Sequence, residues 1–260
     1  MIVLHLLIVL TGLVSGSFLF TIVHRLPKNE SLWKRSACDH CGQTIGVIGL
    51  IPIVGYLVSL GKCPSCKNSI SKLYPSIELL NAVWVYTIFL KTGWTPSFIS
   101  FFLIFETLLL IAILDFHSFT IFPQPVIFGL LVQSIHLAFA DKAEIVNSLI
   151  GLFIGAGIFH WISYLYQTFR NKVGLGEGDA TLLGLIGFCF GWNFLFATIF
   201  WGAILGIIGG GFLLIVRRQS LQKEIAFAPW LVLATFLVWY FPEFFKSIPF
   251  DAAGNLFFAD

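Results

Sequence analysis

Four cysteines occur in two pairs of identical spacing, and their chemistry indicates a metal site. Each pair reads Cys-x2-Cys, and residues 42–62 separate the two pairs. A two-residue gap lets both sulfurs of a pair face one point, so two pairs complete a tetrahedral four-thiolate zinc site. A site of this kind has no open coordination position, so its zinc folds the segment and takes no part in catalysis. The predicted ligands are Cys38, Cys41, Cys63 and Cys66.

Two alternatives compete with zinc at these positions. The four cysteines could form two disulfides, or they could be inert thiols. Both are disfavoured because the topology derived below places the segment on the reducing side of a membrane. The fifth cysteine, Cys189, stands alone in an apolar run and is interpreted as a packing residue.

Two aspartates in apolar surroundings are the other candidates for chemistry. Asp115 ends one apolar run, and Asp179 closes the sequence Gly-Leu-Gly-Glu-Gly-Asp before another. Two carboxylates brought together at low dielectric share a proton, so that one acts as base on water and the other as acid. Gly176 and Gly178 leave room where a peptide substrate approaches the backbone. The competing interpretation makes Asp179 a helix N-cap and Asp115 a boundary residue.

The composition determines where these sites must lie. Apolar residues make up 58% of the 260 residues and charged residues only 11%, against roughly 45–50% and 25% in ordinary globular chains. So few charges cannot cover a water-exposed surface, which excludes a cytosolic enzyme, a disordered chain and a secreted disulfide scaffold. The net charge of +2 gives no reason to expect nucleic acid.

Apolar runs predict an all-α polytopic membrane protein with about eight transmembrane helices. Three regions follow: a first transmembrane helix at 1–24, a cytoplasmic four-cysteine zinc-binding domain at 25–75, and a transmembrane domain at 76–260 that carries both aspartates. No internal repeat is evident. The predicted helices cover 2–24, 76–92, 97–114, 123–140, 146–167, 180–194, 196–216 and 227–241.

Basic residues predict the orientation of these helices. With residues 25–75 in the cytoplasm and eight alternating spans, twelve of the fifteen Lys and Arg residues lie on the cytoplasmic side. The other side keeps only Lys91, Lys142 and Lys246. This asymmetry follows the positive-inside rule, and it places both aspartates at the cytoplasmic boundary of the membrane.

Several motifs in the same order resemble the bacterial type IV prepilin peptidases, which are membrane aspartyl proteases of the GxGD kind. The motif Gly-x-Gly-Asp at 176–179 is similar to their catalytic motif. The two cysteine pairs with Ile51-Pro52 between them resemble the amino-terminal region of the family. So do Gly16-Ser17-Phe18-Leu19, Arg25-Leu26-Pro27 and Tyr74-Pro75-Ser76-Ile77-Glu78.

This resemblance implies a function and residues that perform it. Asp115 and Asp179 take the places of the two catalytic aspartates. The family removes a short basic leader from type IV prepilins and type II secretion pseudopilins, cleaving after Gly and before Phe. Many members then methylate the new N-terminus with S-adenosylmethionine. Glu78 matches a family position that orients the amino-terminal segment or contacts the leader, a simple hydrogen bond between helices being the alternative. Glu177 is a second candidate for leader contact, against an ordinary solvated loop charge.

The resemblance is incomplete, and two other function classes are compatible with the same features. The family often shows Asp-x-Asp-His where this chain reads Asp115-Phe116-His117-Ser118. Altered positions near the amino terminus concern the methyltransferase activity, and no glycine-rich nucleotide-binding motif supports a cofactor site independently. One alternative is a non-enzymatic membrane scaffold that docks pilus or secretion factors through its zinc loop. Another is an ion-coupled transporter, which is disfavoured because its expected internal repeat is missing.

Overall fold

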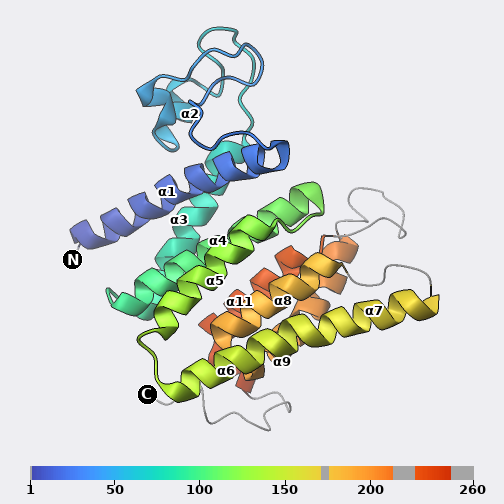
Figure 1. The fold of residues 1–260 in the computed structure, drawn as a ribbon. Coiled ribbons are helices and arrows are strands. Elements are labelled where there is room, and N and C mark those ends of the chain that lie inside the picture. The colour runs from blue at the N-terminus through green and yellow to red at the C-terminus, as the bar shows by residue number, and fades with distance from the viewer. Residues whose placement is uncertain (1, 171–175, 213–225, 247–260) are drawn as a thin grey trace. The chain divides into compact units, whose positions relative to one another are not determined.

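The computed structural model describes residues 2–170, 176–212 and 226–246, which are mainly helical (Figure 1). These residues contain no β-strand and only two isolated β-bridges. Two helical turns, η3 and η4, are π-helical. The helices in chain order are α1 Ile2–Arg25, η1 Leu26–Lys28, η2 Val47–Leu50, α2 Val54–Val58, α3 Leu73–Thr92, α4 Pro96–Ser118, α5 Pro123–Leu137, α6 Lys142–Phe153, η3 Ile154–Ile158, α7 Phe159–Arg170, α8 Glu177–Phe190, α9 Trp192–Leu205, η4 Gly206–Gly210, α11 Ala228–Tyr240 and α12 Pro242–Lys246.

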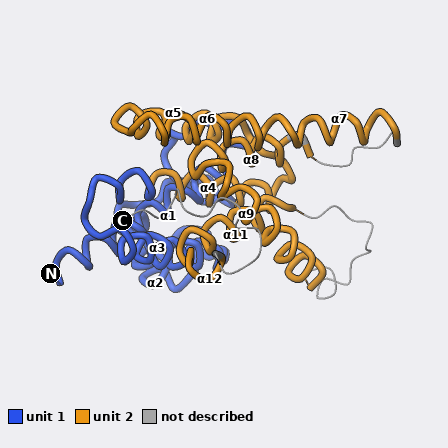
Figure 2. The backbone as a smooth tube through the Cα atoms, turned by 90° about the horizontal axis from the view of Figure 1, so that it is seen from below, with its two compact units in different colours: residues 1–102 blue, residues 103–260 orange. Residues whose placement is uncertain are grey.

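The all-helical prediction is confirmed, but the count of eight spans is not. Among the described residues, five helices are long and apolar enough to cross a membrane. Two further apolar helices, Gly178–Phe190 and Ala228–Tyr240, are shorter. The predicted break near Asn193 falls at Gly191, whose φ of +85° ends α8 and begins α9. Part of the predicted run 196–216 lies outside the described residues. The chain divides into two compact units, residues 1–102 and 103–260 (Figure 2).

In the first unit, α1 and α3 pack closely because α1 presents glycine at the contact. A Cβ atom at Gly12 would lie 2.6 Å from the Cα of Ala82, and one at Gly16 would lie 2.9 Å from the Cβ of Asn81. The fully buried Asn81 amide donates to the Gly12 carbonyl at 2.9 Å and to the Ser15 hydroxyl at 2.8 Å. Small residues and a buried amide are common means of holding helices together where water is absent.

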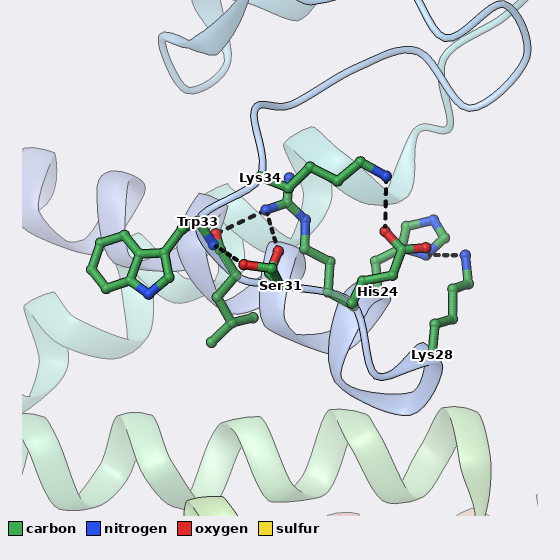
Figure 3. Close-up of polar contacts among 8 residues, drawn as sticks. His24, Lys28, Ser31, Trp33 and Lys34 are labelled. Atoms are coloured by element: carbon green, nitrogen blue, oxygen red, sulfur yellow. Dashed lines mark hydrogen bonds and ion pairs between the residues drawn. The ribbon is translucent and has the colours of Figure 1, made fainter.

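The chain leaves α1 through a turn that its own basic residues stabilise (Figure 3). The Arg25 guanidinium donates to the carbonyl oxygens of Ser31 and Leu32 at 3.2 and 2.8 Å. Lys28 contacts His24 at 3.2 Å, and Lys34 pairs with Glu30 at 3.6 Å. Arg25, the last residue of α1, therefore ties the loop at residues 31 and 32 back to the helix and fixes the direction in which the cysteine-containing segment begins.

Helix α8 lies at the centre of the second unit. Its side chains at Leu182, Leu183, Leu185 and Ile186 are almost fully buried, and α5, α6, η3 and α9 pack around it. Helix α4 joins this core through Phe105, whose ring contacts rings of α8 and α11. A helix that is buried on all sides has apolar residues around its whole circumference, and most of α8 has such a sequence.

Glycines allow the backbones of α6 and α8 to touch. A Cβ atom at Gly151 would collide with the carbonyl oxygen of Gly187, and one at Gly187 would collide with the carbonyl oxygen of Gly151. One turn further along, a Cβ at Gly155 would collide with the backbone of Leu183. Close approach of this kind replaces the hydrophobic effect as a source of stability between helices in lipid.

Replacing Gly151 with alanine should therefore destabilise the second unit. We expect a loss of at least about 2 kcal/mol, because the backbones of α6 and α8 must separate to admit one methyl group. The thermal unfolding midpoint in detergent measures the effect. Gly157→Ala is the matched control, since nothing lies within 4 Å of its Cβ position. Equal midpoints for the two variants would show that the close contact adds no stability.

Candidate functional site

The four cysteines meet at one point in the first unit. Their sulfur atoms all lie within 4.8 Å of one another, and the pairs Cys38–Cys66 and Cys41–Cys63 are 3.8 and 3.9 Å apart. Sulfurs about 2.3 Å from one zinc at tetrahedral angles lie about 3.8 Å apart, whereas a disulfide joins sulfurs about 2.05 Å apart. The geometry fits a zinc ion, and all four cysteines are free thiols in the structure.

Each cysteine pair is built by the same backbone turn. The Cys38 amide donates to the Gln43 carbonyl at 2.9 Å, and the Cys63 amide donates to the Asn68 carbonyl at 2.8 Å. Gly42 and Lys67 follow the pairs at φ of +70° and +59°, and an isolated bridge closes each turn. Residues 36–45 and 61–70 thus form the same turn although their sequences share little beyond the cysteines.

Backbone amides also prepare a sulfur for metal. The amides of Cys66 and Ser65 point at the Cys63 sulfur and lower the pKa of its thiol to about 6. The pKa of the Cys66 thiol moves the other way: despite a hydrogen bond from the Asn68 amide, burial and the neighbouring thiols raise it to about 11. Zinc binds the thiolate and not the thiol, so less free energy is needed to remove the proton of Cys63 than that of Cys66.

The two aspartates lie near each other in the second unit. The Asp115 side chain is buried in the last turn of α4, and Asp179 lies in the first turn of α8. Their charges lie close enough to repel each other. Asp115 was predicted to end its helix, but α4 continues to Ser118 and Asp115 faces the interior of the unit.

The start of α11, a helix predicted at 227–241 but not assigned to the site, contacts Asp115. The Ala228 amide at the start of α11 donates to Oδ2 of Asp115 at 3.1 Å, and Ala228 is fully buried. A carboxylate in the last turn of α4 is opposed by that helix's own dipole, and the amino terminus of α11 compensates for it. Pro229 marks the start of this helix, but no residue type marks the contact between its first amide and Asp115.

The two glycines of the motif lie against the second aspartate. Gly176 caps α8, its carbonyl accepts from the Asp179 amide at 3.0 Å, and its Cβ position is 3.2 Å from Asp179 Oδ2. A Cβ at Gly178 would lie 3.0–3.2 Å from the Ile121 side chain. Side chains at either position would crowd the carboxylate or the segment after α4. The side chain of Glu177 lies outside the described residues.

Glu78 has a structural partner in the first unit. Its buried carboxylate accepts from the Ile53 amide at 2.7 Å. Ile53 has φ of +61° and ψ of −49°, and the Val54 amide closes a tight turn on the Pro52 carbonyl at 2.6 Å. This is the rare, strained form of γ-turn, and a β-branched residue seldom adopts it. Strain of this size, about 1–3 kcal/mol, persists only where surrounding contacts impose it.

Removing the Glu78 carboxylate should release this turn. We expect Glu78→Ala to cost about 1–3 kcal/mol, because the Ile53 amide loses its acceptor. Glu78→Gln should stay close to the wild type, since its amide oxygen can still accept. Limited proteolysis at residues 45–61 gives the readout. Faster cleavage of both variants would show that the charge matters and not the hydrogen bond.

Family models and relatives from the same group of proteins match both units of the chain. Residues 10–92 match the Bacterial Peptidase A24 N-terminal domain, and residues 101–211 match the Type IV leader peptidase family. A Pseudomonas aeruginosa protein named prepilin leader peptidase/N-methyltransferase is 32% identical, over 87% of this chain and 86% of its own length. A Bacillus subtilis protein of the same name is 28% identical, over 89% and 92%.

A third relative, from Aeromonas hydrophila, also bears the name prepilin leader peptidase/N-methyltransferase. It is 26% identical, over 92% of this chain and 94% of its own length. No solved structure matches the chain. The relatives thus cover both the cysteine-containing unit and the unit that holds the two aspartates.

Proposed function

Because this chain belongs to the type IV leader peptidase family, we propose that it removes the basic leader peptide from type IV prepilins or type II secretion pseudopilins. The proposal is supported by Asp115, which is buried and accepts from the Ala228 amide at the start of α11, and by Asp179, which lies close enough to feel its charge. A bond between Gly and Phe is the expected point of cleavage. The scaffold alternative is not favoured, since the matched family is one of leader peptidases and the relatives are named as enzymes.

The pair can hydrolyse a peptide bond without a covalent intermediate. The ionised aspartate takes a proton from water while the water oxygen bonds to the carbonyl carbon. The protonated aspartate donates to the carbonyl oxygen. When the carbon–nitrogen bond breaks, the departing amine takes a proton and the two fragments leave as acid and amine. We assign the ionised role to Asp115, because the Ala228 amide and the α11 dipole stabilise its negative charge.

The location of the chain in a membrane accounts for the position of the scissile bond. We propose that the chain lies in the bacterial inner membrane with eight spans, and that residues 25–75 and both aspartates are on the cytoplasmic side. The positive-inside bias of the Lys and Arg residues supports this topology. A basic leader stays in the cytoplasm while the apolar pilin helix enters the bilayer, so the scissile bond lies at the boundary between them.

Zinc has a structural role in this proposal. Cys38, Cys41, Cys63 and Cys66 would hold it, and four thiolates leave no position for water or substrate. Its chemistry is to join two turns that have little buried apolar surface of their own.

We further propose that methylation of the new N-terminus follows cleavage, with S-adenosylmethionine as donor. Support comes from the relatives, whose names combine peptidase and N-methyltransferase. No strand occurs among the described residues, so the glycine-rich strand–turn–helix of many nucleotide sites is not found there. We therefore assign no residue to this cofactor.

Mass spectrometry of a purified prepilin tests both activities together. Incubation with the enzyme should release the leader at one bond. Addition of S-adenosylmethionine should increase the mass of the mature chain by about 14 Da, because one methyl group replaces one hydrogen. Absence of cleavage by the wild-type enzyme in detergent and in lipid would favour the scaffold. Cleavage without a methyl group would retain the peptidase and reject the second activity.

A further inference from the structure

The segment between the two cysteine pairs has no charge and exposes many apolar side chains. Residues 45–61 contain no Asp, Glu, Lys, Arg or His. Helices η2 and α2 form one small body here, because Gly55 packs directly on the backbone of Gly49. Val47 and Leu60 are 81% and 85% exposed. Ile48, Leu50, Ile51, Val54, Leu57 and Val58 are exposed as well. A water-soluble domain rarely exposes so many neighbouring apolar side chains.

Contacts with α1 and α3 give the depth of this segment. The Ile53 amide binds Glu78, and the Cα of Glu78 lies 3.1 Å from the Cβ position of Gly16. Gly16 lies nine residues before the end of α1, which is roughly 13 Å along the helix. Glu78 lies five residues after the start of α3, roughly 8 Å. The turn at Ile53 therefore reaches below the ends of both apolar helices.

The backbone of the segment is arranged as lipid requires. Pro52 has no amide hydrogen, and the Ile53 amide, which lies deepest by these contacts, is satisfied by the Glu78 carboxylate. Most other amides bond within the segment, to carbonyl groups between residues 46 and 57. Lipid offers no partner for a backbone amide or carbonyl group, so an element that enters the acyl region needs internal hydrogen bonds of this kind. The donors are Gly49, Ile51, Val54, Gly55, Leu57, Ser59, Leu60 and Gly61.

The surroundings of the segment match a bilayer boundary. Its exposed apolar surface has a counterpart on α3, where Leu79, Leu80 and Val83 are exposed beside Glu78. Basic residues lie at the end of α1 and just beyond it, after the segment, and directly before α3. This order of apolar surface beneath positive charge complements acyl chains beneath anionic headgroups. The basic residues are Arg25, Lys28, Lys62, Lys67 and Lys72.

We propose that residues 45–61 are a membrane-inserted element, with their apolar side chains among the lipid acyl chains just below the headgroups. The four-cysteine site then anchors both ends of this element, since Cys41 precedes it and Cys63 follows it. The region predicted as a cytoplasmic domain at 25–75 thus has a part that lies in the bilayer. This inference uses the membrane location of the chain and is independent of its catalytic activity.

The accessibility of a spin label to oxygen and to a nickel chelate measures how deep this element lies in the bilayer, and the full chain is used. A nitroxide is attached through a ketone-bearing amino acid at position 58, so that the cysteines stay free for zinc, and the protein is placed in phosphatidylglycerol–phosphatidylethanolamine nanodiscs. We expect oxygen, which concentrates in acyl chains, to relax the label more than a water-soluble nickel chelate. The matched control is position 68 in the second cysteine turn, where Asn68 is exposed and the chelate should dominate.

Two outcomes would overturn the proposal. Nickel access at position 58 equal to that at position 68 would place the segment in water. Exclusion of both reagents would mean that a protein surface covers it, such as the rest of this chain or the apolar helix of a substrate. Labelling at position 60 repeats the measurement at a second exposed site. A zinc content of one per chain shows that each labelled protein has folded, and loss of prepilin cleavage would leave the depth result unaffected.

Discussion

Replacing Asp115 or Asp179 with asparagine should lower the rate of prepilin cleavage by at least about 10³-fold, because general acid–base groups acting as a unit contribute effects of this size. Asparagine keeps an oxygen that can accept from the Ala228 amide, so Asp115→Asn retains the contact with α11. The single-turnover rate of leader release, measured with purified enzyme in lipid, is the readout. Combining both changes should add little to either one, since the two carboxylates share one task.

A matched control separates chemistry from folding. Glu106→Gln removes another buried carboxylate from α4, roughly 13 Å along the helix from Asp115. It should cleave at nearly the wild-type rate. Zinc content and thermal midpoint should be alike in all variants. Substantial cleavage by either aspartate variant would reject the dyad, whereas an equal loss in Glu106→Gln would assign the effect to structure.

Both candidate sites could be proposed from the sequence because each has a local signal. The Cys-x2-Cys spacing fixes how two sulfurs face one point, and two such pairs leave few alternatives to a metal site. An ionisable residue beside an apolar run is costly in lipid, so Asp115 and Asp179 stand out from the composition alone. Helices also follow from long apolar runs, and α1, α3 and α11 lie within a few residues of their predicted ranges.

Contacts between distant residues could not be predicted in the same way. The Ala228 amide reaches Asp115 across 113 residues, and Glu78 reaches Ile53 across 25. A hydrogen bond from a backbone amide, or a strained turn at an isoleucine, does not require a particular residue type and so cannot be predicted from one. The repeated turn around the cysteines was missed because its two copies share backbone geometry and few side chains. The predicted cytoplasmic domain included residues 45–61 because the charges on either side outweighed an apolar run too short to span a membrane.

Replacing Cys63 with alanine, or removing the metal with a chelator, should unfold the segment between α1 and α3. A four-thiolate zinc site contributes about 10–16 kcal/mol of apparent binding free energy. Apart from the metal site, the two turns are held mainly by backbone hydrogen bonds and isolated bridges. We therefore expect loss of zinc and rapid proteolysis within residues 36–70. The contact between α1 and α3 should persist, because Asn81, Gly12 and Gly16 make it without the metal.

Cys189→Ala is the control for this last experiment, since it removes a thiol from α8 in the other unit and should leave the zinc content unchanged. Zinc bound per chain and the rate of proteolysis must change together if the metal folds the segment. A Cys63→Ala protein that keeps its zinc and its resistance to proteolysis would show that three thiolates suffice.

The rate of prepilin cleavage by the metal-free protein tests whether residues 45–61 position the substrate. Because the zinc site anchors both ends of residues 45–61 while the aspartates lie in the other unit, a loss of cleavage would mean that this segment positions the substrate for a dyad that is itself intact.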